Sequence, residues 1–267
     1  MKLTVLCPAI RTERWVGMYN SIDKAFSGTW ELIIISSKQL PDELKDKPNI
    51  NLIYSRRSPM GKQQEGLVQA KGEYITVVSD DSVFFEGALD KVFADGIKED
   101  ITVMKYLEGP EFEFPRIHQI ENPIQGRTNY DFMKSDYYYW TDTHDSSKMR
   151  GIPHHSPILS VALIKRDLLI GIGGWECKFS SQAVGNNDLA ARLMINGCKY
   201  EIKDIVVSKC GYMEEGSGDH GPIHYAQLEE DQPRLEALYR NITDRKVIDI
   251  DNWKKTPEVW ARGGDRN

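Results

Sequence analysis

Short apolar runs alternate with longer polar stretches along the first hundred residues. The runs at residues 3–7, 32–35, 51–54 and 74–78 have the length and composition of buried strands. The stretches between them that carry helical spacing of apolar residues are 15–26, 63–70 and, for one short turn, 41–44. This alternation is typical of strand–helix units that build a mainly parallel sheet flanked by helices. We therefore predict an α/β domain whose first half is of nucleotide-binding type.

The pattern becomes irregular between residues 108 and 157, where aromatic, proline and histidine residues are frequent. Long loops of this kind are usually functional or disordered, and the aromatic content argues against disorder. Regular elements are expected again at 158–164 (strand), 187–196 (helix), 205–207 (strand) and 225–239 (helix). In an open sheet, ligands bind at the carboxyl ends of the strands, so the residues that follow each apolar run are the candidates for chemistry.

Composition narrows the class of protein. The 267 residues include 34 basic and 40 acidic side chains, for a net charge of -6. This balance lacks the excess of positive charge that favours binding to nucleic acid or to an anionic membrane surface. We therefore expect no nucleic-acid partner. No window approaches the ~20 apolar residues of a transmembrane helix, and no signal-peptide pattern is present. The four cysteines are scattered without a Cys-x-x-Cys pair, which fits reduced thiols in a cytoplasmic protein.

Two adjacent carboxylates, Asp80 and Asp81, follow the strand expected at 74–78. Hard cations such as Mg²⁺ and Mn²⁺ prefer carboxylate oxygens and keep positions open for phosphate, as a diphosphate leaving group requires. The alternative for an isolated Asp-Asp pair is a turn that carries two solvated acids. The neighbouring motifs decide between the two interpretations.

Five motifs in order along residues 1–240 resemble the glycosyltransferase family 2 group with the GT-A fold. They are Leu6-Cys7-Pro8, then Gly61…Gly66…Ala70-Lys71-Gly72-Glu73-Tyr74-Ile75, then Ser79-Asp80-Asp81, then Gly173-Gly174-Trp175-Glu176, then Asp188-Leu189-Ala190-Ala191-Arg192-Leu193 with Gly197. The resemblance implies a GT-A domain with a mainly parallel central sheet, a nucleotide-diphosphate-sugar donor, a glycan-like acceptor and a Mn²⁺ or Mg²⁺ ion. Residues 1–106 would bind the donor and 107–240 the acceptor. A C-terminal tail, 241–267, would serve acceptor capture or a homo-oligomer.

The resemblance also implies roles for individual residues near the donor. The metal-binding motif of the family falls on Ser79, Asp80 and Asp81, with Asp81 as the direct metal ligand and Asp80 or a water compensating for Ser79. The residues that would line the base and ribose are Pro8, Ala9, Arg11, Glu13 and Ser36. Gln64 and Glu65 stand where the family has Arg-Asn, and the Lys62 ammonium is available for phosphate or, alternatively, for solvent.

The catalytic base is less clearly indicated. An inverting transferase needs a carboxylate to take the proton of the acceptor hydroxyl, and the family position for it is Asn186, whose amide is no base. Asp188 is the nearest carboxylate, although a first-turn acid can instead stabilise its helix. A retaining mechanism, or a base among Asp142, Asp145 and Glu176, stays open.

Histidines and aromatic residues complete the list of candidates. Many GT-A enzymes carry a late histidine in the metal shell, and His220 matches by position, with His224 as the competitor. The glycines around His220 would let residues 214–221 close over the donor as a lid. Residues 137–140, His154 and His155 are candidates for an acceptor pocket, because aromatic faces stack on sugar rings; packing is the alternative.

The sequence therefore predicts a metal-dependent glycosyltransferase of hexosyltransferase type. A sugar-phosphate nucleotidylyltransferase is the rival enzyme, but it would need a glycine-rich, basic loop after the first strand, and residues 8–12 lack one. A non-catalytic nucleotide-sugar-binding module is the rival of another class, since Ser79 and Asn186 replace expected acids.

Overall fold

A computed structural model describes residues 1–110, 124–125, 138–139, 143–145, 155–157, 159–212 and 221–240. The longer strands are β1 (Leu3–Pro8), β2 (Trp30–Ser36), β3 (Ile50–Tyr54), β4 (Tyr74–Val77), β6 (Ile101–Pro110), β11 (Ala162–Lys165) and β12 (Tyr200–Tyr212). The shorter strands are β5 (Val83–Phe84), β7 (Ile124–Gln125), β8 (Tyr138–Tyr139), β9 (Thr143–Asp145) and β10 (His155–Pro157). The helices are α1 (Thr12–Ala25), α2 (Asp42–Lys45), α3 (Pro59–Gln69), α4 (Ala88–Ala94), α5 (Arg166–Gly171), α6 (Gln182–Ile195), α7 (Gly221–Ala226), the π-helical turn Gln227–Asp231 and α8 (Gln232–Arg240).

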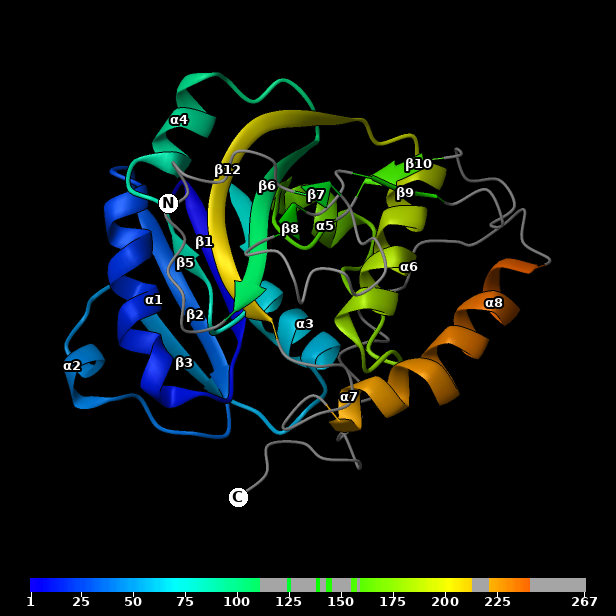
Figure 1. Cartoon of the computed structure of the whole chain (residues 1–267), viewed down its shortest axis with the longest axis horizontal. Coiled ribbons are helices and arrows are strands. Elements are labelled where there is room, and N and C mark those ends of the chain that lie inside the picture. Colours follow the sequence, from blue (N-terminus) through cyan, green and yellow to red (C-terminus); the bar gives the residue numbers. More distant parts are fainter. Residues whose placement is uncertain are drawn as a thin grey trace.

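One mixed sheet forms the centre of the fold (Figure 1). Its main strand order is β3-β2-β1-β4-β11-β6-β12-β5, in which β3, β2, β1 and β4 run parallel to one another. β11 lies antiparallel between β4 and β6, and β12 returns parallel to β6. The sheet is therefore α/β as predicted, but mixed, because β11 and β5 run against their neighbours. Since β6 and β12 point the same way as β4, their carboxyl ends lie at the same edge of the sheet.

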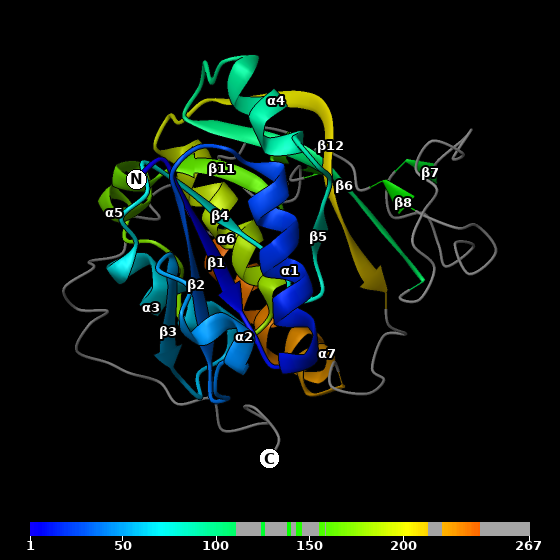
Figure 2. The same ribbon diagram turned by 90° about the vertical axis from the view of Figure 1, so that its left-hand side faces the viewer.

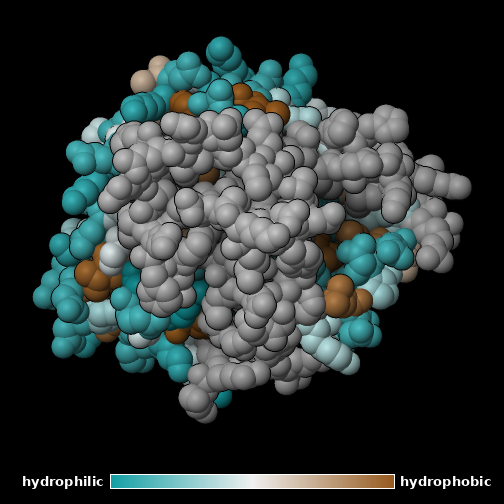
Figure 3. Space-filling view, in the orientation of Figure 1, coloured by the Kyte–Doolittle hydropathy of each residue, from teal (hydrophilic) through white to brown (hydrophobic). Residues whose placement is uncertain are grey.

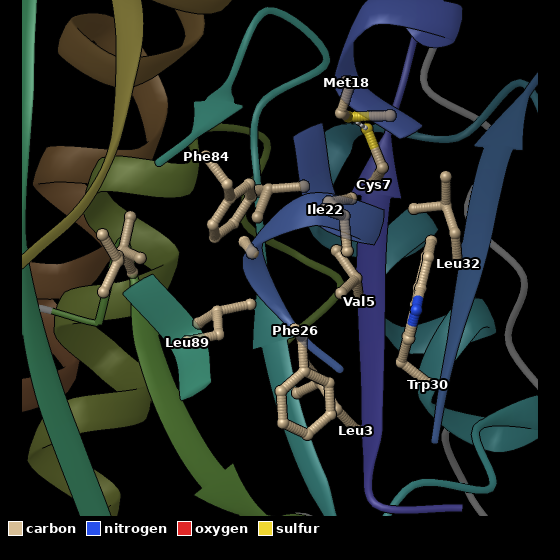
Figure 4. Close-up of a cluster of buried hydrophobic side chains, with 14 of the residues drawn as sticks. Leu3, Val5, Cys7, Met18, Ile22, Phe26, Trp30, Leu32, Phe84 and Leu89 are labelled. Carbon is tan, nitrogen blue, oxygen red and sulfur yellow. Dashed lines mark hydrogen bonds between the residues drawn. The ribbon is translucent and has the colours of Figure 1, made fainter. Parts of the chain in front are cut away.

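Helices cover both faces of the sheet, and the alternation of side chains along β1 shows how. Val5 and Cys7 pack with Met18 and Ile22 of α1 in one buried cluster, which Figure 4 shows. Leu6 points to the other face, into a second cluster that includes residues of α3, α5 and α6. Figure 2 accordingly shows α1 in front of the strands and α6 behind them. Strands buried on both faces read as continuous apolar runs, which explains why the sequence pattern locates β1 and β2.

Helix α6 begins earlier than its local pattern predicts, at Gln182 rather than at 187. The Asp231 carboxylate, 50 residues away in the sequence, accepts hydrogen bonds from the backbone N–H groups of Ser180 (2.9 Å) and Ser181 (2.7 Å). Burial raises the pKa of Asp231, and these two N–H donors oppose that shift. The start of α6 is thus capped by a remote side chain that no local signal reveals.

Several other elements differ from the sequence pattern. The strand expected at 158–164 is β11, which covers only Ala162–Lys165, whereas the run at 205–207 is the middle of the much longer β12. The segment at 225–239 is helical but contains the π-helical turn Gln227–Asp231. The division drawn at 106/107 falls inside β6, and residues 241–267 lie outside the described part of the chain.

On the face drawn in Figure 3, the coloured margins are mostly hydrophilic, with a few apolar patches between them. Large exposed apolar side chains are scattered over different elements: Met1, Tyr54, Val68, Ile202, Tyr225 and Leu228. Within the described ranges, no helix combines the length and hydrophobicity that crossing a bilayer requires.

Gly72 sits where β4 begins beside β1, and its backbone N–H donates to the Thr4 hydroxyl (2.8 Å). A Cβ atom at Gly72 would lie 2.3 Å from the backbone nitrogen of Thr4, and neither backbone can move without breaking the β1–β4 pairing. We expect Gly72→Ala to lower the free energy of unfolding by about 3 kcal/mol. The matched control is Gly17→Ala on the exposed face of α1, which meets no atom within 4 Å and should raise stability by about 0.5–1 kcal/mol. Urea unfolding of both variants tests this contrast, and equal stabilities would contradict it.

Candidate functional site

The carboxyl ends of β1 and β4 lie side by side, because the two strands are parallel and in register from Leu3–Tyr74 to Leu6–Val77. The loop after β1 therefore meets the residues that follow β4. Asp80 joins the two: its Oδ2 accepts hydrogen bonds from the backbone N–H groups of Ile10 and Arg11, both at 2.7 Å.

The Asp80 carboxylate is fully engaged within the protein. Its Oδ1 accepts from Arg11 Nε at 2.8 Å, and the same guanidinium forms a salt bridge to Oδ1 through Nη2. Two backbone donors and a two-pronged guanidinium use both oxygens, so Asp80 fixes the β1–α1 loop and orients Arg11.

Asp81 is placed differently, although it is also largely buried (side chain 5% exposed). Its Oδ1 accepts a hydrogen bond from the Ser79 hydroxyl. Its Oδ2 faces two guanidinium groups at longer range, Arg11 Nη1 at 3.4 Å and Arg14 Nη1 at 4.0 Å. The contacts of Oδ2 are long for ion pairs, so this oxygen retains capacity for a further partner.

The Cys7 thiol, at the end of β1, lies in the field of these charges. Burial raises the pKa of Cys7 well above its usual value, and the charges of Asp80 and Asp81 raise it further. Arg11 and Lys62 oppose the shift, which brings the buried Lys62 of α3 into the same neighbourhood. A thiol in this setting is protonated and acts as core packing against Met18, to whose sulfur it lies at 3.6 Å.

The residues predicted to line the nucleotide fall around the same edge. Ala9 is buried, and its N–H donates a hydrogen bond to the carbonyl oxygen of Ile35 near the end of β2 (3.0 Å). Ser36 is buried, and its hydroxyl accepts from the Lys38 N–H (3.1 Å). Pro8 ends β1 and is half-buried. Glu13, at 67% exposed, turns to Arg14 and solvent.

The Gln64 side chain is engaged within the protein. Its buried amide bridges two backbone groups, with Nε2 donating to Gly173 O (2.9 Å) and Oε1 accepting from Trp175 N–H (2.7 Å). A Cβ atom on Gly174 would lie 2.1 Å from Gln64 Oε1, so the glycine is needed there. Gln64 therefore anchors the Gly173–Trp175 turn to α3. Because its amide makes these internal hydrogen bonds, it is not available to bind a nucleotide-sugar. Its neighbour Glu65 forms a salt bridge with Arg57 (2.9 Å).

Asp188 is a fully buried residue of α6, and its contacts are with other parts of the protein interior. Its Oδ2 accepts from Arg192 Nε (2.9 Å) and its Oδ1 from the Tyr239 hydroxyl (2.9 Å). Arg192 in turn donates to the carbonyl oxygens of Ile172 (3.0 Å) and Gly174 (2.6 Å). Asp188 and Arg192 are fully buried, which argues against Asp188 as the base, since an acceptor hydroxyl cannot reach a carboxylate with no exposed surface.

The other carboxylates proposed as the base are described to different degrees. Glu176 is half-buried in the turn before α6, and its Oε1 accepts from the Lys178 N–H (3.3 Å). Asn186, at the family position of the base, accepts from the Trp175 indole N–H (3.2 Å). Asp142 lies outside the described residues, and of Asp145 only the backbone, in β9, is described.

The predicted histidine ligand and the acceptor-pocket residues mostly lie outside the described part of the chain. Those outside are His220, His154, Tyr137 and Trp140, whereas His224, His155, Tyr138 and Tyr139 are described only by their backbone.

Two basic residues near this edge were not singled out by the sequence. Arg14, on the first turn of α1, converges on Asp81 with Arg11. Lys209 of β12 lies opposite Val83 of β5, two residues beyond Asp81. Burial lowers the pKa of Lys209 to about 8. The sequence missed Lys209 because the strand predicted at 205–207 ended two residues before it, whereas β12 continues to Tyr212.

The described residues can be tested for their fit to a divalent cation. Among them, no group of three or more His, Cys, Asp and Glu side chains is placed to hold a metal. A cation that takes most of its ligands from phosphate and water needs only one or two protein carboxylates. Asp81 Oδ2 fits that smaller requirement, whereas the Asp80 oxygens are already occupied by donors.

Comparison with solved structures identifies the fold. TarS of S. aureus matches with a TM-score of 0.56 at 13% sequence identity, over 94% of this chain and 41% of TarS. TarS 1–349 in complex with UDP-GlcNAc matches with a TM-score of 0.57 at 13% identity, over 94% of this chain and 69% of that one. The complex of TarS 1–349 with UDP gives a TM-score of 0.54 at 13% identity, with coverages of 94% and 68%. No protein-family model and no curated protein sequence matches the chain. The chain thus has the GT-A-like α/β fold that it shares with TarS, as the sequence motifs predicted.

Proposed function

We propose that this chain is a glycosyltransferase that binds a nucleotide-diphosphate-sugar at the carboxyl ends of β1 and β4 and transfers the sugar to an acceptor hydroxyl. The observation that carries the proposal is the convergence of Arg11 and Arg14 on Asp81 at that edge. In open α/β sheets this edge is where ligands bind. Support also comes from the shared fold, because TarS has been crystallised with UDP and with UDP-GlcNAc.

The residues of the site suit a diphosphate. Arg11 is held by Asp80 with part of its guanidinium directed to Asp81, and Arg14 stands on the adjacent helix turn. One guanidinium group can bind two phosphate oxygens at once through two parallel N–H donors. The two arginines would therefore hold and orient the diphosphate. The buried Lys62 adds a third positive charge near the end of β1.

We include in the proposal a Mn²⁺ or Mg²⁺ ion held by Asp81, with His220 as a further predicted ligand. When bound, such an ion stabilises negative charge on a leaving nucleotide diphosphate. For the base, which must take the proton of the acceptor hydroxyl in an inverting transfer, Asp142, Asp145 and Glu176 stay as candidates. A glycan-like acceptor, a cytoplasmic location and a homo-oligomer also stay predictions.

The proposal is tested by calorimetric titration of the protein with UDP-GlcNAc, and with the diphosphates of other bases, in the presence of Mn²⁺. A donor-hydrolysis assay follows with each nucleotide-sugar that binds. We expect binding together with slow release of the nucleoside diphosphate, since water can replace a missing acceptor. Binding without turnover would favour a non-catalytic module, and release of inorganic diphosphate from a nucleoside triphosphate and a sugar phosphate would favour a nucleotidylyltransferase. No binding to any nucleotide would contradict the proposal.

A further inference from the structure

A chain of buried hydrogen bonds runs from helix α8 through α6 to a turn of the main chain. The Tyr239 hydroxyl donates to Asp188 Oδ1 (2.9 Å), and Asp188 Oδ2 accepts from Arg192 Nε (2.9 Å). The Arg192 guanidinium then donates to the carbonyl oxygens of Ile172 (3.0 Å) and Gly174 (2.6 Å). The side chains of Asp188 and Arg192 have no exposed surface, and Tyr239 is 2% exposed. Bulk water therefore cannot replace a bond that is lost from this chain.

The Arg192 guanidinium is a stiff link, because it is planar and its N–H donors have a fixed geometry. A rotation of the Asp188 carboxylate would therefore move the guanidinium, together with the two carbonyl oxygens that it holds. The Tyr239 hydroxyl restrains that rotation, since it binds the carboxylate oxygen other than the one that accepts from Arg192 Nε. It also lies 3.2 Å from the backbone oxygen of Asp188, which fixes it to the α6 main chain.

The turn held by Arg192 is also tied to helix α3 and to the start of α6. The Trp175 N–H donates to Gln64 of α3 (2.7 Å), and Lys62 of the same helix lies near the end of β1, where we propose that the donor binds. The Trp175 indole N–H donates to Asn186 (3.2 Å), which stands at the family position of the base. Glu176, one of the candidate bases, follows the turn directly. A shift of the turn would therefore displace Glu176.

We infer that Tyr239 is a positioning residue for the proposed transfer. Through the buried pair of Asp188 and Arg192, it fixes the Gly173–Trp175 turn and with it Glu176. Because Tyr239 is buried, it acts through this chain and not by touching a substrate. A displacement of about 1 Å at a reacting group can lower a rate about a hundredfold. This inference rests on the proposed function and adds a residue of α8 to the support of its site.

Tyr239→Phe tests the inference, because it removes the hydroxyl and keeps the ring in its packing. We expect kcat for the release of UDP from UDP-GlcNAc to fall at least about tenfold. The Kd for UDP, measured by calorimetry, should stay at the wild-type value, since Arg11 and Arg14 are outside this chain of bonds. A loss confined to kcat indicates a displaced reacting group, whereas a general loosening of the fold would also weaken UDP binding.

The matched control is Tyr19→Phe in α1. The Tyr19 hydroxyl donates to Asn49 Oδ1 (2.9 Å), and Tyr19 is also buried, so the same substitution removes the same kind of bond. That bond leads to the residue before β3 and not to the turn. Both variants should lower the melting temperature by a similar few degrees. Only Tyr239→Phe should lower kcat.

A second measurement follows the turn without turnover. Tryptophan is replaced by 5-fluorotryptophan throughout the full chain, and the ¹⁹F resonance of Trp175 is assigned from its loss in a Trp175→Phe variant. Because the Trp175 indole bonds to Asn186, its resonance reports the position of the turn against α6. We expect this resonance to shift in Tyr239→Phe and to keep its wild-type position in Tyr19→Phe.

Two kinds of result would count against the account. If Tyr239→Phe kept the wild-type kcat, lost no more of it than Tyr19→Phe, or left the Trp175 resonance unshifted, the inference would be overturned and the proposed function would stand. Wild-type protein that binds no nucleotide and releases no UDP would instead remove the proposed function, and the inference with it.

Discussion

An Asp188→Ala variant will lose about 3–5 kcal/mol of unfolding free energy, which corresponds to a melting temperature lower by roughly 10 °C. The substitution leaves the Arg192 guanidinium buried without its carboxylate partner and the Tyr239 hydroxyl without an acceptor at Oδ1. An uncompensated buried charge is among the most destabilising changes that a single substitution can make. Differential scanning calorimetry and urea unfolding measure the loss.

A second variant shows whether the loss comes from the ion pair. Replacing both partners, Asp188→Leu with Arg192→Met, removes both charges and should restore part of the stability. The recovery will be incomplete, because Arg192 also donates to the carbonyl oxygens of Ile172 and Gly174. If Asp188→Ala instead kept its full stability and lost only turnover, Asp188 would be the base and the structural role given to it here would be wrong.

An Asp81→Asn variant will lose turnover by at least about a hundredfold while it stays folded. The substitution removes one negative charge and keeps the shape, so the amide oxygen can still accept from Ser79, and Arg11 keeps its contacts with Asp80. With the carboxylate gone, the site would lose the one described oxygen that we propose as a ligand of the cation. Release of nucleoside diphosphate from the donor, measured beside the melting temperature, gives both readouts.

The matched control is Asp204→Asn, which makes the same change at an exposed position (91%) paired with Lys105 on the surface. This variant should retain both turnover and stability. Full turnover in Asp81→Asn would show that the carboxylate has no part in the reaction.

The sequence located β1, β2 and β4 because they are buried on both faces and read as mainly apolar runs, and it located the more exposed β3 by the apolar residues Ile50, Leu52 and Ile53. It missed β6, in which Lys105 and Glu108 interrupt the apolar pattern, and it shortened β12, which contains Lys203, Asp204 and Lys209. Long-range partners make these polar positions acceptable in strands: Lys105 pairs with Asp204 across β6 and β12. Such pairs become visible only once the strands are adjacent.

For the candidate site, the sequence indicated the position but not the division of roles. Two adjacent aspartates after a strand look alike in a sequence. In the structure, however, the Asp80 carboxylate is hydrogen-bonded to the β1–α1 loop, whereas Asp81 faces the arginines. Gln64 and Asp188 occupy motif positions, but both bind other parts of the protein in the interior. Whether a polar side chain faces solvent or a buried partner depends on tertiary contacts, which no single-sequence spacing encodes.

The most direct test of the central claim is a crystal structure of the protein soaked with UDP-GlcNAc and Mn²⁺, with anomalous diffraction used to locate the ion. We predict that the diphosphate lies at the ends of β1 and β4 against Arg11 and Arg14, with the anomalous peak beside the Asp81 carboxylate. A nucleotide bound at another surface, with Asp81 still facing only the two arginines, would contradict the account.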